Sequence, residues 1–214
     1  PPPVAVERRF AEPLGSTVHA TKILAELADE AIADLTERGK GGRHFRATFF
    51  RSDGLARSIE VETGHPTRDT RLVMRLFAER MDGLADPLDP GFGFDMIRLA
   101  VPRLDPLGAT QLKLEGGEVR EAAMGELVDR MTTRLGRRRV KKLIAEDTHI
   151  PEQAQLALPA IDAPPPLPWQ MPEPGEPPTR PFHLFDPPQP IEVIAEVPDG
   201  PPHQFRWRRQ AHAV

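Results

Sequence analysis

The sequence contains no cysteine among its 214 residues. Disulfide bonds and cysteine-ligated metal sites are therefore excluded, which fits a reducing compartment. No apolar run approaches the ~20 residues that a transmembrane helix requires, and the N-terminus carries no recognisable signal peptide. We therefore expect a cytoplasmic protein that has no membrane partner.

The motifs of common catalytic sites are also missing. The sequence holds no GxSxG motif, no phosphate-binding glycine loop and no histidine pair at the four-residue spacing of a helical zinc site. A group of carboxylates on one predicted helix is interpreted as a solvated face rather than as metal ligands; it comprises Glu26, Asp29, Glu30 and Asp34. We therefore predict no catalytic residue, no metal and no cofactor in this chain.

An excess of basic residues is lacking too, because the formal net charge is −4. Bulk charge therefore gives no support for nucleic-acid binding, but the distribution of charge does. Residues 16–37 contain Lys22 as their only base among five acids, whereas residues 134–142 contain six bases and no acid. An acidic back and a basic front can orient a protein on a phosphate backbone.

Proline is abundant but unevenly placed. Of 26 prolines, 16 lie between Pro159 and Pro202, so we expect a folded front and a proline-rich rear. The first residue is Pro1 rather than Met, and we expect a piece of a longer protein. We divide the chain into residues 1–106, 107–158, 159–181 and 182–214.

The periodicity of the front predicts an α+β fold. A strand at 4–11, a helix at 16–37, two strands within 42–64, a helix opening at Pro66 and Thr67, and a strand at 91–102 follow in order. This βαββαβ order gives a four-stranded sheet with both helices on one face and the other face open.

The rear is predicted to hold fewer elements. A third amphipathic helix has its apolar stripe between Met124 and Leu135, and a short strand is expected at 140–145. Beyond the proline-rich linker, residues 191–197 and 205–209 predict a small β-hairpin.

The central hairpin is unusually basic. Phe45, Ala47 and Phe49 alternate with polar residues, and Asp53-Gly54 supplies the turn. Its arginines leave two interpretations open, a surface for a polyanion or a solvated hairpin. Alternation places Arg46 on the open face; the others fall at the rim, namely Arg43, Arg51 and Arg57.

Two further segments carry open alternatives. The run from Arg134 to Lys142 is a phosphate clamp, a partner surface or a solubilising loop. Phe205 and Trp207, which alternate with arginines, either stack on a base or pack the hairpin onto a neighbour.

Several motifs together resemble a known family. ERRFAEPL (7–14), FRSDG (50–54) and DPGFGFDMIRLAV (89–101) are similar to the little-finger domain of Y-family lesion-bypass DNA polymerases. HIPEQA (149–154) and PFHLFDPPQPIEVIAEVPDGPPHQFRWRR (181–209) resemble the C-terminal region of the ImuB-type homologues in that family. The resemblance covers nearly the whole chain.

This resemblance implies an adaptor in bacterial DNA-damage-induced translesion synthesis, nucleoid-associated when acting. The palm and fingers would precede Pro1, and this part would perform no bond chemistry. The implied partners are damaged primer–template DNA, the sliding clamp, an error-prone replicative-type polymerase and a RecA-related accessory protein. The expected DNA-binding residues are Arg43, Arg46, Arg51, Arg57, Arg98, Arg137, Arg138 and Arg139.

A clamp-binding peptide is also implied, at Gln111, Leu112 and Leu114. Glu115 departs from the family pattern, because it stands where an aromatic residue should enter the clamp's apolar pocket. An interdomain loop is the alternative interpretation of this segment. For the whole chain, the alternatives are the C-terminal half of an active Y-family polymerase, or a protein-interaction module that does not contact DNA.

Overall fold

The computed structural model describes residues 4–107, 117–146, 148, 153–165, 185–195, 200 and 202–213, without the side chains of 117–121. The chain divides into two compact units. The first comprises Pro1–Leu143 with Ala157–Pro165, and the second comprises Ile144–Leu156 with Pro166–Val214. The predicted clamp peptide, Gln111 to Leu114, lies outside the described residues.

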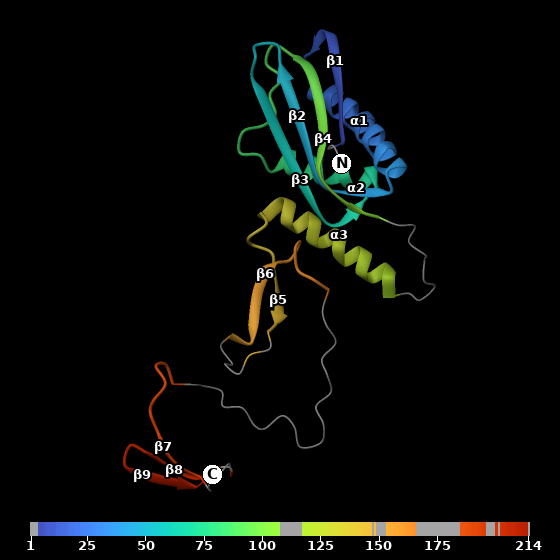
Figure 1. Ribbon diagram of the computed structural model, residues 1–214. Coiled ribbons are helices and arrows are strands. Elements are labelled where there is room, and N and C mark those ends of the chain that lie inside the picture. The colour runs from blue at the N-terminus through green and yellow to red at the C-terminus, as the bar shows by residue number, and fades with distance from the viewer. Residues whose placement is uncertain are drawn as a thin grey trace. The chain divides into compact units, whose positions relative to one another are not determined.

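The first unit has the predicted βαββαβ order (Figure 1). Its sheet is antiparallel, with the strand order β1-β4-β2-β3. The last strand therefore pairs between the first and second strands and completes the sheet. The elements are β1 (Val4–Leu14), α1 (Thr17–Glu37), β2 (Lys40–Arg51), β3 (Ala56–Thr67), α2 (Thr70–Asp82) and β4 (Phe94–Pro106).

Helix α1 begins and ends close to the predicted positions. Ser16 is its N-cap and accepts a hydrogen bond from the backbone N–H of His19. The predicted stripe is buried against the sheet, with Leu24, Leu27 and Leu35 each 0% exposed. Because this stripe follows the 3.6-residue period, the helix buries one face against the strands.

Helix α2 begins later than predicted. Strand β3 continues through Pro66 to Thr67, so the expected opening of the helix at these residues was wrong. The Asp69 carboxylate accepts hydrogen bonds from the backbone N–H groups of Arg71 and Leu72 and fixes the start of the helix at Thr70.

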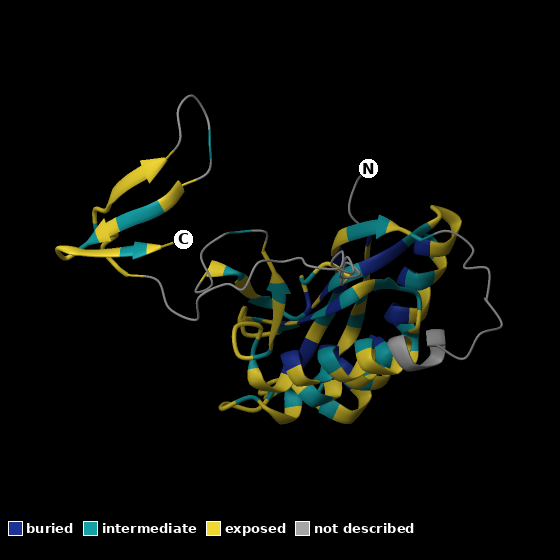
Figure 2. Cartoon of the chain, turned by 90° about the horizontal axis from the view of Figure 1, so that it is seen from below, coloured by how far each residue is buried: buried dark blue, intermediate teal, exposed yellow. Residues whose placement is uncertain are grey.

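The core lies between the two helices and one face of the sheet (Figure 2). Phe45, Ala47 and Phe49 point into it from β2, as the alternation predicts. Gly42 is required beside them, because a Cβ at this position would collide with the Phe45 ring. Gly54 has φ +85° and closes the β2–β3 turn, where the N–H of Arg51 donates to Leu55 O at 2.8 Å.

Helix α3 (Gly117–Leu135) packs against β3 and α2 within the first unit through polar side chains. The Asp129 carboxylate, 4% exposed, accepts a hydrogen bond of 2.7 Å from the N–H of Gly64 in β3. Arg130 Nε donates to Glu79 Oε1 of α2 at 2.5 Å, and Thr133 is also buried. Burial raises the pKa of Asp129 to about 6, although the Gly64 N–H and the Arg43 charge oppose the shift.

The remaining strands are short. The sequence missed β6, which pairs with β5, and β9, which makes the predicted C-terminal hairpin a three-stranded sheet. None of the described residues from 185 to 213 is buried (Figure 2). The strands are β5 (Lys141–Ala145), β6 (Gln155–Pro159), β7 (Glu192–Ala195), β8 (Pro202–Trp207) and β9 (Gln210–Ala213).

Replacing Asp129 with Asn should stabilise the protein near neutral pH. The folded-state pKa of Asp129 is raised from 3.8 to about 6, so its protonated form stabilises the fold at low pH and this contribution is lost as pH rises through about 6. Above that pH, Asn should be more stable by on the order of 1 kcal/mol, because it keeps an acceptor for Gly64 without a buried charge.

The measurement is the free energy of urea unfolding between about pH 4 and 8. Glu37→Gln is the matched control, because Glu37 is an exposed carboxylate at the end of α1, whereas Glu126 itself helps to raise the pKa of Asp129. If the gain from Asp129→Asn is the same at both ends of this pH range, ionisation of Asp129 does not affect stability.

Candidate nucleic-acid interface

The sheet face opposite the core forms a candidate binding surface, which we call the open face. Its side chains alternate with the buried ones along each strand, and they are absent from the core cluster. Both charged and apolar side chains lie on it. It comprises Glu7 and Arg9 of β1, Met96 and Arg98 of β4, His44, Arg46, Thr48 and Phe50 of β2, and Ser58, Glu60 and Glu62 of β3.

The basic groups at the centre of the open face pair with glutamates. Arg98 Nη2 lies 2.6 Å from Glu7 Oε2, and Arg46 Nε lies 2.6 Å from Glu60 Oε1. The other Glu60 oxygen lies 2.9 Å from His44 Nε2. The face is therefore close to charge balance, with the arginine side chains still 43% and 45% exposed.

These pairs shift the acidities of both glutamates. The hydrogen bond from Arg98 holds the pKa of Glu7 below its ordinary value. Partial burial raises the pKa of Glu60, but hydrogen bonds from Arg46 and His44 outweigh it and lower the pKa overall. Both glutamates are ionised at neutral pH and compete with any other anion for the arginines.

An aromatic ring lies beside one of these pairs. The Arg98 guanidinium carbon lies 5.6 Å from the centroid of the Phe50 ring, within cation–π range. Thr48 and Ser58, the next residues across the sheet, join their hydroxyls at 2.9 Å. The open face thus offers charge, hydroxyls and one aromatic ring along neighbouring strands.

Arg43 lies inside the fold rather than on the open face. Its side chain is 13% exposed, and its Nε donates to the carbonyl oxygen of Thr63 at 2.7 Å. The remaining nitrogens contact Asp105 at 3.3 Å and the carbonyl of Ile161 at 3.4 Å. Arg43 therefore ties the end of β3 and the segment after β6 to β2.

Arg51 and Arg57 also use their donors within the protein, at the rim as alternation predicted. Arg51 bonds Asp53 at 2.5 Å and approaches Asp89 at 3.5 Å, which joins the β2–β3 turn to the loop before β4. Arg57 bonds Asp86 at 2.8 Å in the same loop. Their side chains are 17% and 27% exposed.

The structure brings one residue of the basic run to the sheet. Arg137 contacts Glu62 of β3 at 2.6 Å and also pairs with Asp162. Burial lowers the pKa of Arg137, but these carboxylates raise it overall. Arg138 and Arg139 are exposed, and neither side chain has an ion pair within the part of the chain that the structure describes.

Sequence reasoning missed Arg9, whose side chain is 74% exposed and 3.4 Å from Glu7. The signal was present, because Arg9 has the opposite parity to Val4 and Val6, which face the core. Arg9 thus extends the basic part of the open face to the edge strand.

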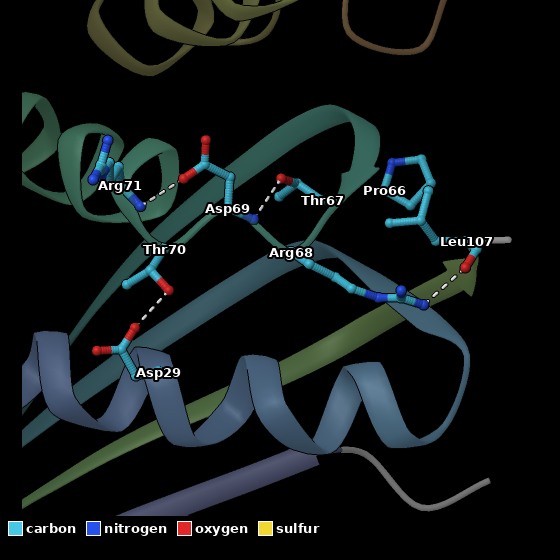
Figure 3. Close-up of a pocket in the computed structure, with 8 residues that line it drawn as sticks. All are labelled: Asp29, Pro66, Thr67, Arg68, Asp69, Thr70, Arg71 and Leu107. Atoms are coloured by element: carbon cyan, nitrogen blue, oxygen red, sulfur yellow. Dashed lines mark hydrogen bonds between the residues drawn. The ribbon is translucent and has the colours of Figure 1, made fainter. Parts of the chain in front are cut away.

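A pocket at the start of α2 lies elsewhere in the domain (Figure 3). Arg68 donates to the carbonyls of Lys40 and Leu107 at 2.6 and 2.7 Å, and Thr70 donates to Asp29 at 2.7 Å. These groups are paired within the protein and hold the ends of β2 and β4 beside the helix. We assign the pocket no ligand.

Two other features are absent from the described residues, a cluster of metal ligands and a membrane-spanning helix. No three His, Asp or Glu side chains among them are grouped to hold a metal ion. None of the helices in those same segments is long and apolar enough to cross a bilayer.

The fold and the open face together define a class. An antiparallel sheet with a split βαβ order, helices on one face and paired arginines on the other is a two-layer α+β domain with one uncovered sheet face. Residues 1–114 match the impB/mucB/samB family C-terminal domain, and the chain belongs to this family.

The relatives found agree with this assignment. The chain is 31% identical over 208 residues to "Protein ImuB" of Caulobacter vibrioides, in strains NA1000 / CB15N and ATCC 19089 / CIP 103742 / CB 15. This covers 96% of the chain and 43% of each relative, so the chain spans less than half the length of these curated relatives. The resemblance to ImuB-type Y-family homologues is confirmed.

One solved structure is also similar to part of the chain. It is the complex of the beta-clamp processivity factor and the little finger domain of PolIV, with 22% sequence identity and a TM-score of 0.35. The match covers 53% of this chain and 98% of that one.

Two arginine substitutions should separate structural from surface roles. Arg43→Ala should lower the free energy of unfolding by about 2 kcal/mol, because it leaves the buried Thr63 carbonyl without its charged donor. Arg46→Ala should change it by less than about 0.5 kcal/mol, because an exposed ion pair contributes little. Urea unfolding of both variants checks this, and equal effects would contradict the assignment.

Proposed function

We propose that this chain holds damaged primer–template DNA by its phosphate backbone, as the non-catalytic C-terminal part of a polymerase-like subunit in translesion synthesis. The observation that carries the proposal is the open face, on which exposed arginines occupy neighbouring strands of a domain of this family. The distances between these arginines are set by the pairing of the strands and do not match the pattern of base edges in a groove. Such a surface binds phosphates without reading sequence.

The glutamates of the open face make this grip weak and reversible. Each phosphate must displace a carboxylate from an arginine, so binding exchanges one charge-assisted hydrogen bond for another. Net gain then comes mainly from released counterions, which makes affinity fall steeply with salt. We propose micromolar or weaker binding.

The expected DNA-binding arginines differ in the intramolecular contacts that each would lose on binding a phosphate. Arg46 and Arg98 keep nearly half of their side-chain surface exposed and can turn toward a phosphate. Arg51 and Arg57 lie at the rim, where they can add a contact without leaving Asp53 or Asp86. Arg137 extends the surface past β3, because it pairs with Glu62. Arg138 and Arg139 stay predicted contacts, and the grip on the open face does not require them. Arg43 stays a predicted contact, and its donors face inward.

Protein partners complete the proposal. Gln111, Leu112 and Leu114 would bind the sliding clamp, weakly because Glu115 replaces an aromatic residue. The C-terminal sheet would recruit protein partners, and the candidates are the error-prone polymerase and the RecA-related protein. In β7 and the residue before it, Ile191, Val193 and Ile194 are about half exposed, as expected of a contact surface. No cofactor is required, and the setting is the bacterial cytoplasm after DNA damage.

The open face should control DNA affinity in both directions. Arg46→Ala with Arg98→Ala should weaken binding to a labelled primer–template duplex about tenfold and reduce the salt slope by about two. Glu60→Gln should strengthen binding about two- to threefold, because it removes a competing charge from Arg46. Fluorescence anisotropy between about 50 and 200 mM NaCl measures both effects.

The matched control is Arg71→Ala with Arg75→Ala. These two arginines are exposed on α2, on the helix-covered side, and their loss changes net charge equally. If both double variants bind DNA alike, the open face is not the contact surface. Absence of any salt-dependent binding would instead support a module that contacts only proteins.

A further inference from the structure

Helix α3 presents its apolar stripe to solvent. The four largest members are Met124, Leu127, Met131 and Leu135, which are 59%, 45%, 39% and 52% exposed. Their three- and four-residue spacing places them on one side of the helix, over three turns and about 16 Å. The opposite side is the buried one, and it carries polar residues.

The contacts of the buried side explain this orientation. Asp129 bonds Gly64, Arg130 bonds Glu79, and Thr133 bonds back to its own helix. The Asp129 and Arg130 contacts attach α3 to β3 and α2, so the helix cannot turn its stripe inward without breaking them. The apolar stripe therefore faces solvent, while the contacts on the opposite side of α3 fix the orientation of the helix.

Basic residues border the exposed stripe at its C-terminal end. Arg134 lies in the last turn of α3, and the chain continues through Arg138, Arg139, Lys141 and Lys142, all exposed. None of these five side chains has an ion pair or hydrogen bond within the described segments. Four half-exposed apolar residues thus adjoin five unpaired positive charges.

We propose that this α3 surface binds an acidic amphipathic helix of a protein partner. Helix-in-groove recognition uses apolar anchors at helical spacing for affinity and flanking charges for orientation. The partner helix would need about three turns of apolar anchors and carboxylates beyond the end that meets Arg134 and Arg138. Met124 and Met131 add adaptable packing surface, which suits such a contact.

Other occupants fit these observations less well. A DNA backbone would satisfy the five charges but leave the apolar stripe in water. A second copy of the chain would cover the stripe but bring its own basic run in place of carboxylates. An acidic amphipathic helix satisfies both requirements, and its binding does not depend on the DNA-binding proposal.

The test uses the full 214-residue chain with ¹³C-methyl-labelled methionine. The probe is a synthetic amphipathic peptide of about 18 residues, with leucines at helical spacing and glutamates flanking them. A peptide with lysine in place of each glutamate is the control. The methyl signals of Met124 and Met131 report on α3, Met96 reports on the open face, and the partly buried Met74 and Met81 serve as references.

The acidic peptide should shift the Met124 and Met131 signals, leave Met96 unchanged, and bind at least tenfold more tightly than the lysine peptide. Leu127→Ser with Met131→Ser should reduce its affinity at least tenfold. The control Leu55→Ser removes a leucine that is 51% exposed at the β2–β3 turn, and it should change nothing.

Three results would overturn the proposal. The first is equal binding of the two peptides, or none. The second is a dependence of the Met124 and Met131 signals on protein concentration alone, which would identify a second copy as the occupant. The third is a shift of these two signals by duplex DNA, which would identify the surface as a phosphate site.

Discussion

Side-chain alternation in β2 is the constraint on which the rest of the structure depends. Because Phe45, Ala47 and Phe49 must reach the core, Arg46 and Thr48 must point the other way. A one-residue slip would bury Arg46 and expose the aromatics. The same residues that hold α1 and α2 onto the sheet thus create an open face. The open face and the core are the two sides of one alternation, so the register of β2 fixes both together.

Arginine carries two different tasks in this domain, and the surroundings of each side chain decide which. Arg43, Arg51 and Arg57 connect segments that are distant in sequence, and their charges are matched inside the protein. Arg46 and Arg98 pair with glutamates only across strands that are already joined by backbone hydrogen bonds, β2 with β3 and β4 with β1. The arginines of this hairpin are therefore of two kinds in space, those that connect distant segments and one, Arg46, that lies on the open face.

Local patterns predicted most of the fold, and failed where distant contacts decide. The α1 stripe and the Asp53-Gly54 turn are readable because period and turn chemistry agree. The predicted start of α2 was wrong because β3 continues through Pro66 to Thr67, which pairs with Gly42 of β2. The apolar stripe of α3 faces outward because Asp129 and Arg130 bond Gly64 and Glu79, and the sequence of the helix alone does not reveal these partners. For the open face, parity placed Arg46 correctly, whereas the glutamate partners needed the cross-strand register.

The position of β4 in the sheet also shapes how the domain can form. Its residues pair with β1 on one side and β2 on the other, with Val101 opposite Val4 and Leu99 opposite Ala47. Val4 and its partner Val101 lie nearly a hundred residues apart in the sequence, so β1 gains its neighbour in the described sheet only after β4 has been synthesised. Contacts of such sequence separation make folding slow and cooperative. Until then, β1 has no partner in the described sheet and one edge of β2 is unpaired, so the pairing of β4 completes this sheet.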